Sequence, residues 1–411
     1  MQKILVYTPK ITPRVQYIFD FILREFSGIE FELTTNFQFF EASDLPKINY
    51  SKEKFENEIH LVSDELMFEK IISDKIKFEE LNEIGKIFFA LSRYEEYLPQ
   101  EKDVHGRISG KGKVYKTPFV DNWILKFQEK LKAKYPELNF KKRTFEMILT
   151  CDVDQTWKYK NKGFLRTYGA FFKDLIQLNF KEFSTRKNVI LGKEKDEFDT
   201  FEFYEMLRQA QHDKKENFRM IFFWLMADYA KFDKNNPVAN LFFQEKIREV
   251  SKWAEIGIHP SYASNSHSDK LKIEIQRLEN ISGQKITKSR QHFIQLNLPE
   301  TYQKLIQHGI EEDYTMAYAD ETGFRAGTCT PFFWYDLSKD EKTELKAHSF
   351  CAMDVTLRNY LKLNPNEASE ELIRLKKEIQ RVNGQMITLF HNSNFGKEWN
   401  GWKVVLENLF Q

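Results

Sequence analysis

Short apolar runs recur through the last two-thirds of the chain, and each breaks abruptly into polar, Gly or Pro residues. Such runs predict buried strands. Segments with helical periodicity separate most of them, and this alternation predicts a parallel sheet. Six or seven strand–helix units in about 265 residues favour a (β/α) barrel over a doubly wound sheet. The predicted strands are residues 145–151, 220–226, 256–258, 286–293, 314–318, 324–327 and 386–390, and the predicted helices are residues 201–210, 241–252, 269–280, 299–309 and 367–383.

The first part of the chain has a different pattern of hydrophobic and polar residues. A β-like start at residues 4–7 precedes a helical segment at 15–26, and a basic helix is predicted at 123–134. A polar stretch that contains Pro136 then forms the best linker candidate. We therefore expect a smaller α/β domain of unknown function at residues 1–142 and a barrel at 143–411.

A long Lys- and Phe-rich gap separates the first two predicted strands of the barrel. We interpret residues 156–218 as a helical insertion. Within it, residues 159–173 are typical either of a solvated helix face or of a surface for an acidic ligand.

Composition and charge exclude several classes of protein. The 411 residues are 41% hydrophobic and 30% charged, which is typical of a soluble globular protein. Lys and Arg (62) balance Asp and Glu (61), so no global field favours nucleic acid or an anionic membrane. The chain has no apolar run of the ~18 residues that span a bilayer, and its start lacks a signal-peptide pattern. We expect a cytoplasmic protein without a membrane span.

The three cysteines are too few and too scattered for a disulfide framework or a zinc knuckle. We expect Cys151, Cys329 and Cys351 to be buried thiols.

Polar residues stand where the predicted strands end, which is where a parallel barrel assembles its active site. Asp313 opens a predicted strand, and Arg325 lies inside another. If the barrel forms, two carboxylates, three histidines and an arginine converge on one rim. The strand-end residues are Asp152, Asp154, His259, Arg290, His292 and His391.

The pair Asp152 and Asp154 would lie on the same side of an extended strand. Two like charges so close need a cation or an arginine, which indicates metal binding; alternatively, the aspartates cap the next helix. Arg290 and His292 also share a face, and a buried Arg290 would need a carboxylate such as Asp152. The alternatives are a core or turn role for His259 and surface ion pairs for the two arginines.

These motifs resemble the polysaccharide deacetylases of the NodB-homology type, carbohydrate esterase family four. Members have a distorted (β/α) barrel and hydrolyse N-acetyl or O-acetyl groups on glycans with a divalent metal, which we expect to be zinc. The five family motifs are resembled, in order, by residues 150–154 (TCDVD), 257–262 (GIHPSY), 289–293 (SRQHF), 313–315 (DYT) and 389–392 (LFHN).

The resemblance implies a role for each matching residue. Asp152 would be the general base, oriented by Arg290, and His391 would be the general acid. Asp154 and His259 would bind the metal. Asp313, in the fourth motif, completes the expected catalytic set.

One position departs from the family pattern. The second motif normally supplies two histidines four residues apart, and here the second position is Ala263. The third ligand must then come from His292, His267 or His391, or the metal site is lost. We expect His292.

The whole chain resembles a two-domain subgroup of deacetylase-like proteins common in bacterial surface-glycan loci. The resemblance rests on residues 91–97 (LSRYEEY), 103–107 (DVHGR) and 323–328 (GFRAGT). It implies a metal-dependent deacetylase that acts on an acetylated sugar or glycan precursor. The alternative is a catalytically degenerate barrel that binds glycan or a biosynthetic partner.

Overall fold

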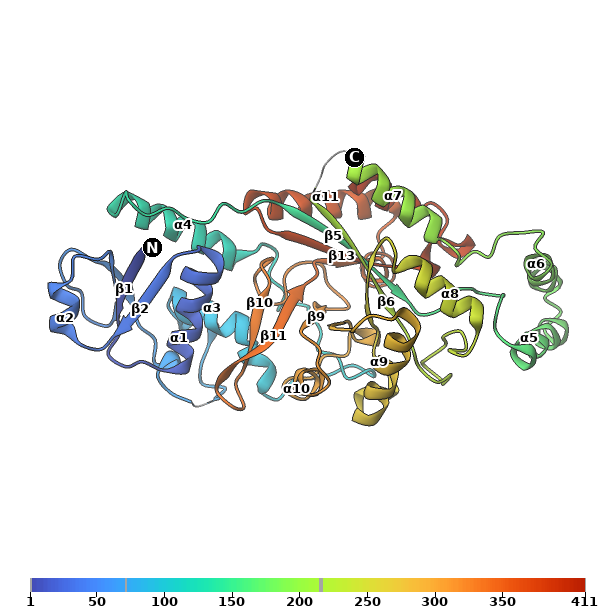
Figure 1. Ribbon diagram of the computed structural model, residues 1–411, viewed down its shortest axis with the longest axis horizontal. Coiled ribbons are helices and arrows are strands. Elements are labelled where there is room, and N and C mark those ends of the chain that lie inside the picture. The colour runs from blue at the N-terminus through green and yellow to red at the C-terminus, as the bar shows by residue number, and fades with distance from the viewer. Residues whose placement is uncertain (1, 71, 214–216, 411) are drawn as a thin grey trace.

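The computed structural model describes residues 2–70, 72–213 and 217–410, and the molecule is elongated (Figure 1). Within these residues, a four-stranded sheet near the N-terminus occupies one end, and a nine-stranded sheet with its helices forms most of the rest. Strands and helices alternate in both parts. The protein therefore has the predicted α/β fold, with a smaller α/β part before the larger one.

The smaller sheet is entirely parallel, in the order β2-β1-β3-β4. Its inner strand β1 carries the apolar run Ile4 to Val6, fully buried as expected for a parallel strand covered by helices. The elements of this part are β1 (Lys3–Tyr7), α1 (Pro13–Phe19), a π-helical continuation (Asp20–Phe26), β2 (Glu30–Thr34), α2 (Phe37–Ala42), β3 (Lys47–Ser51), β4 (Ile59–Val62), α3 (Glu83–Ser92) and α4 (Phe119–Lys134).

The larger sheet has the order β10-β11-β9-β8-β7-β6-β5-β13-β12, and all its pairs are parallel except the β10–β11 hairpin. No ladder joins β10 to β12 within the described part of the chain, so the curled sheet is an incomplete, distorted barrel, as predicted. Its strands are β5 (Glu146–Val153), β6 (Phe218–Trp224), β7 (Glu255–Ile258), β8 (Lys288–Ser289), β9 (Glu312–Met316), β10 (Phe332–Asp336), β11 (Glu341–Ser349), β12 (Ala352–Met353) and β13 (Gln385–His391).

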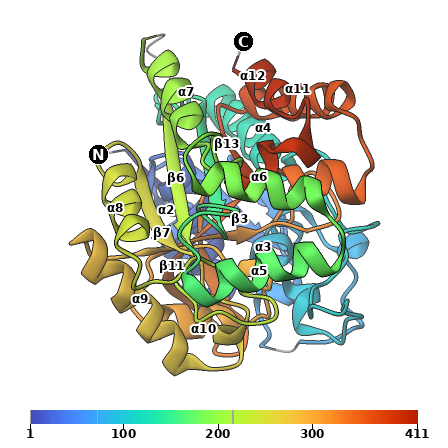
Figure 2. The same cartoon turned by 90° about the vertical axis from the view of Figure 1, so that its right-hand side faces the viewer.

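Helices surround the larger sheet, as the view along the long axis shows (Figure 2). Cys151, Cys329 and Cys351 are buried free thiols, as predicted. The surrounding helices are α7 (Phe201–Asp213), α8 (Leu241–Val250), α9 (Ser268–Ser282), α10 (Glu300–Gln307), α11 (Pro365–Arg381) and α12 (Lys403–Leu409).

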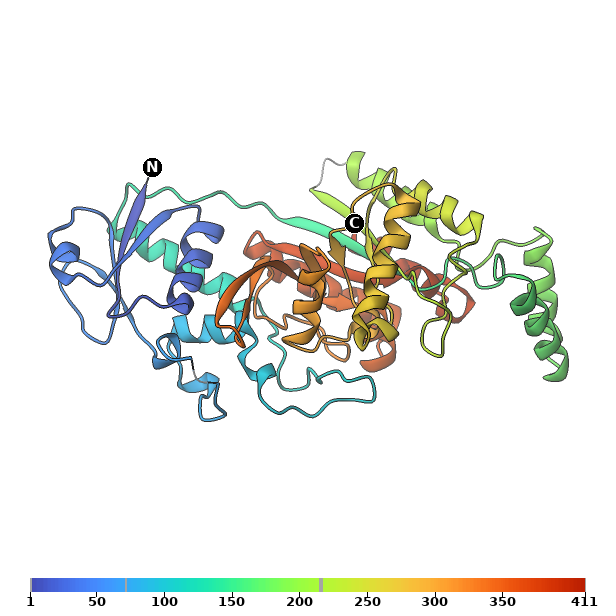
Figure 3. The ribbon, with the colours of Figure 1, turned by 60° about the horizontal axis from the view of Figure 1, so that its bottom comes forward.

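Two further helices lie between β5 and β6. Helices α5 (Phe164–Ile176) and α6 (Phe180–Ile190) form a hairpin at the end of the molecule farthest from the N-terminal sheet (Figures 1 and 3). None of the helices within the described ranges is both long enough and apolar enough to cross a bilayer.

The prediction of a strand at residues 324–327 is wrong. Phe324 makes only an isolated bridge with Tyr115, and Gly327 accepts a hydrogen bond from the backbone of Val120. This segment is buried by the N-terminal part instead of by a sheet. Strands β10 and β11 are also absent from the predicted set. The first half of β11 is an exposed, charged hairpin arm without an apolar run, whereas β10 has the apolar sequence FFWYD and could have been predicted.

The two parts of the chain are joined by buried ion pairs. Arg14 Nε contacts Asp340 Oδ1 at 2.7 Å, and both side chains are buried. Glu96 accepts hydrogen bonds from Arg93 Nε at 2.8 Å and from Arg325 Nη2 at 2.6 Å. Arg325 therefore lies in a buried interface, neither at the rim of the barrel nor on the surface.

Candidate functional site

A cavity of about 190 Å³ lies where several strands of the larger sheet end. Asp152 and Asp154 are at the end of β5, His259 follows β7, and His391 ends β13. This is the carboxyl edge, where parallel barrels place their reacting groups. The lining residues are His105, Arg107, Asp152, Asp154, His259, His292, Phe293, Ile294, Met353, Val355, Tyr360 and His391.

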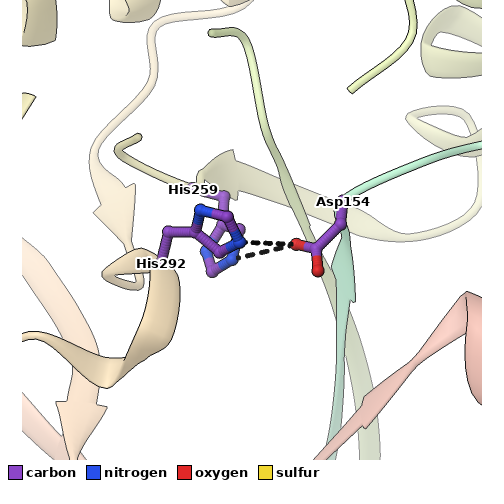
Figure 4. Close-up of side chains that lie close together, drawn as sticks. All are labelled: Asp154, His259 and His292. Carbon is purple, nitrogen blue, oxygen red and sulfur yellow. Dashed lines mark ion pairs between the residues drawn. The ribbon is translucent and has the colours of Figure 1, made fainter. Parts of the chain in front are cut away.

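Asp154, His259 and His292 converge on one point (Figure 4). Asp154 Oδ1 lies 3.4 Å from His259 Nε2 and 3.5 Å from His292 Nε2. Ligands held at about 2.0 to 2.2 Å in a tetrahedron lie about 3.3 to 3.6 Å apart, so this spacing fits a zinc-like cation. Asp154 Oδ1 is also a buried atom without a hydrogen-bond partner in the described residues. The donor set and its spacing therefore fit a divalent metal.

Hydrogen bonds orient both histidines. His259 Nδ1 lies 2.6 Å from the backbone oxygen of Arg290, so Nδ1 carries the proton and the lone pair of Nε2 faces the cluster. His292 Nδ1 lies 3.0 Å from Asp233 Oδ1. A carboxylate behind a ligating imidazole fixes the ring and raises its basicity.

Asp233 was not singled out in the sequence, because it lies in an irregular segment after β6 and not at a strand end. It also accepts a hydrogen bond from the backbone N–H of Tyr262, at 2.8 Å. One carboxylate therefore connects the second and third motifs.

Asp152 lies beside the cluster and is almost fully buried. Its Oδ2 is 3.7 Å from His259 Nε2, and its Oδ1 is 3.7 Å from Arg290 Nη1. The Arg290 guanidinium is fully buried between the rings of Phe223 and Phe350, at 5.1 and 4.7 Å. Burial lowers the Arg290 pKa, but the group remains a cation at neutral pH. It holds a fixed positive charge next to Asp152.

His391 occupies another side of the cavity. Its Nδ1 lies 2.9 Å from Asp354 Oδ1, and its backbone N–H donates to Asp354 Oδ2 at 2.7 Å. Burial lowers the His391 pKa, but Asp354 and the two cavity aspartates outweigh burial and raise it to about 10. His391 therefore carries a proton at neutral pH, as a general acid requires.

Asp354 was also missed in the sequence. It follows the two-residue strand β12, at the end of the apolar run 350–353 (FCAM), which is not among the predicted strands. The same strand-end signal that identified His391 could have identified this residue.

Some predicted residues do not line the cavity. Asp313 is fully buried at β9, where it accepts hydrogen bonds from Ser289 Oγ at 2.7 Å and Thr315 N at 2.9 Å; burial raises its pKa. His267 is exposed at the start of α9, outside the metal cluster. Asp313 is placed to support the neighbouring strand and not to touch a substrate.

The N-terminal part contributes two residues to the cavity through residues 102–108, which we call the 102–108 loop. Its Arg107 donates to the backbone oxygen of Phe293 at 3.2 Å and to Tyr360 Oη at 2.8 Å. The ring of its His105 packs against Phe293, with centroids 4.7 Å apart. In Figure 3 the cyan segment that includes this loop extends from the N-terminal part along the barrel.

No strand-end signal marks this loop in the sequence, because residues 104–106 form a turn. His105 and Arg107 reach the cavity only through long-range contacts.

We expect metal binding to release a proton. Burial lowers the His292 pKa, but Asp154 and Asp233 outweigh burial and raise it to about 9. A cation must displace this proton at pH 7, so metal affinity should rise by about tenfold per pH unit up to about pH 9. Titration calorimetry in buffers of different ionisation enthalpy measures the number of protons released. Affinity that is constant from pH 6 to 9, without proton release, would contradict His292 as a ligand.

Comparisons with known proteins find one family model and several solved structures. Residues 4–136 match DUF7033, a family of unknown function. No curated protein sequence is significantly similar to the chain.

Solved structures resemble the chain at low identity. One is a protein from Mycobacterium smegmatis inferred to be a polysaccharide deacetylase (16% identity, 65% of this chain and 82% of that chain, TM-score 0.39). Another is a polysaccharide deacetylase from Bacillus cereus (11% identity, 66% and 86%, TM-score 0.31). A third is a peptidoglycan deacetylase from Bdellovibrio bacteriovorus (11% identity, 66% and 50%, TM-score 0.29). At these low identities, the geometry of the site is what indicates the function. The part of the chain that matches the family of unknown function contributes His105 and Arg107 to that site.

Proposed function

We propose that the protein is a metal-dependent deacetylase that hydrolyses an acetyl group from an N- or O-acetylated sugar or glycan precursor. The observation that carries this proposal is the arrangement around Asp154, His259 and His292. A buried carboxylate, Asp152, lies on one side of this cluster, and a protonated histidine, His391, lies on another. Hydrolysis of an acetamide or acetate ester needs these three functions in one cavity.

The residues divide the reaction between them. Two imidazoles and one carboxylate would hold the cation, a set that zinc accepts while keeping a position open. When bound, the cation would polarise the acetyl carbonyl and lower the pKa of water. Asp152 takes the proton from the attacking water, with Arg290 keeping the carboxylate in place. His391 donates its proton to the departing amine or alkoxide, and Asp354 stabilises the imidazolium.

Apolar side chains complete the cavity. Ile294, Met353 and Val355 lie on its wall and offer a surface for the acetyl methyl group. The alternative of a degenerate barrel was motivated by Ala263. Because His292 offers a third donor, Ala263 is no longer an argument for a lost site.

Metal analysis and acetate release test the proposal together. Protein purified without chelator should hold about one divalent ion per chain and release acetate from at least one member of a panel of acetylated sugars and sugar precursors. Chelation should abolish release, and added zinc should restore it. Metal-loaded protein that releases no acetate from any of these substrates would overturn the proposal.

A further inference from the structure

Helix α5 presents an apolar stripe to solvent. Leu165, Phe172 and Ile176 have exposed fractions of 84%, 66% and 66%. Their spacing places them on one face of the helix, together with Tyr168 and Leu175. Several large apolar side chains exposed side by side mark an interaction site in a soluble domain.

The stripe is not the unpacked inner face of the hairpin. The other face of α5 contacts α6, through the rings of Phe171 and Phe183 at 5.0 Å and an ion pair of Asp174 with Arg186 Nε at 2.7 Å. Figure 2 shows the two helices side by side at the end of the molecule. The hairpin therefore has its own interior, and the stripe faces outward.

The hairpin is also strongly basic. Residues 158–193 hold nine Lys or Arg and two Asp or Glu, so the segment carries a net charge of +7 in a chain of +1. Lys173, Lys181 and Lys187 are exposed, and none of them forms an ion pair with any residue that the structure describes. The hairpin therefore combines an apolar stripe on α5 with free lysines on both helices, and this combination is typical of helices that lie in the interface of an anionic membrane.

We propose that the α5–α6 hairpin docks on the surface of an anionic lipid bilayer, with the stripe among the acyl chains and the lysines at the phosphates. The charge favours a membrane over a protein partner, because the cores of protein interfaces are depleted of Lys. It also disfavours a second copy, since a two-fold contact through this face would bring the lysines of both copies together.

A short segment of chain connects the hairpin to the candidate site. Helix α5 begins ten residues after Asp154, and Arg166 Nη1 donates to the backbone oxygen of Asn235 at 3.0 Å. Asn235 is two residues from Asp233, which orients His292. Docking would therefore hold the cavity near the bilayer. This inference about the substrate rests on the proposed function: the substrate class would be an acetylated sugar attached to a membrane lipid.

Vesicle flotation of the full chain tests the docking. We expect binding to vesicles of phosphatidylglycerol and phosphatidylcholine, and little binding to phosphatidylcholine alone. The variant L165Q/F172Q/I176Q should bind at least about 10-fold more weakly. The variant K173Q/K181Q/K187Q should bind anionic vesicles on the order of 10²-fold more weakly and lose most of the salt dependence.

Matched controls change the same residue types elsewhere. M206Q/L241Q/F242Q removes three exposed apolar side chains outside the hairpin, and K126Q/K130Q/K134Q removes three exposed lysines of α4; both should bind like the wild type. Circular dichroism checks that each variant is folded. Wild-type protein that does not float with anionic vesicles would overturn the docking, as would a concentration-dependent dimer that only L165Q/F172Q/I176Q abolishes.

The two proposals fail separately. Acetate release from a soluble acetylated sugar should be unchanged in L165Q/F172Q/I176Q, so activity without vesicle binding overturns only the docking. Vesicle binding without acetate release from any soluble or lipid-linked substrate overturns only the proposed function and the substrate class that rests on it.

Discussion

Asp152→Asn should lower acetate release by about 10²- to 10⁴-fold while the protein keeps its metal. The amide preserves the shape of the side chain but cannot accept a proton from water. Asp152 lies 3.7 Å from His259 Nε2 and is not part of the three-residue cluster, so its replacement should leave the ligands in place. Acetate release and metal stoichiometry, measured on the same preparation, check both parts.

Two further variants provide the contrast. Asp154→Ala should lose both metal and activity, because it removes the one carboxylate of the cluster. His391→Ala should keep the metal and retain slow turnover. Loss of metal in Asp152→Asn, or full activity in that variant, would contradict the division between base and ligand.

Glu96→Gln should lower the free energy of unfolding by about 3 to 5 kcal/mol. Glu96 is the shared partner of two buried guanidiniums, those of Arg93 and Arg325. Its neutral replacement leaves the buried Arg325 without a carboxylate partner and Arg93 with Glu95 alone, at 2.7 Å, and removing one member of a buried ion cluster costs more than the cluster contributes. Urea-induced unfolding at pH 7 measures the change.

Glu378→Gln is the matched control. Glu378 pairs with Arg381 on the surface of α11, where the Arg side chain is 69% exposed, so its loss should cost less than about 1 kcal/mol. Equal effects of the two variants would contradict a special role for the buried cluster.

The pH dependence of this effect has a defined sign. Burial raises the Glu96 pKa, but Arg325 and Arg93 outweigh burial and lower it from its ordinary value of 4.5 to about 2. A depressed carboxyl pKa stabilises the folded state above the unfolded pKa, and this stabilisation is lost as the pH falls toward the folded value. The difference between wild type and Glu96→Gln should therefore be full at pH 7 and shrink between about pH 4.5 and 2.

Residues at strand ends were predictable from the sequence because two local rules locate them. An apolar run indicates a buried strand, and parallel strands end on one edge. Asp152, Asp154, His259 and His391 follow these rules, and the structure brings them to one cavity. His292 follows a two-residue strand, β8, and was expected as the third ligand because Ala263 stands where the family motif has its second histidine.

Residues outside strand ends were not predictable in the same way. Asp233, His105 and Arg107 lie in irregular segments, whose positions depend on contacts with distant parts of the chain. The buried residues 324–327 (FRAG) led to a wrong strand prediction for a related reason, because burial against another part of the protein produces the same pattern as burial in a sheet. Local periodicity reports burial and does not report what covers a segment.

The groups that react in the cavity and the 102–108 loop that forms one of its walls come from different parts of the chain. The reacting groups belong to strand ends between residues 152 and 391, whereas one wall comes from a loop that ends before residue 109. Val104, in the middle of this loop, is 91% exposed, so its side chain is not constrained by packing. Position 104 can therefore vary in sequence without disturbing the metal cluster, which lets substrate range evolve independently of the reaction that the barrel supports.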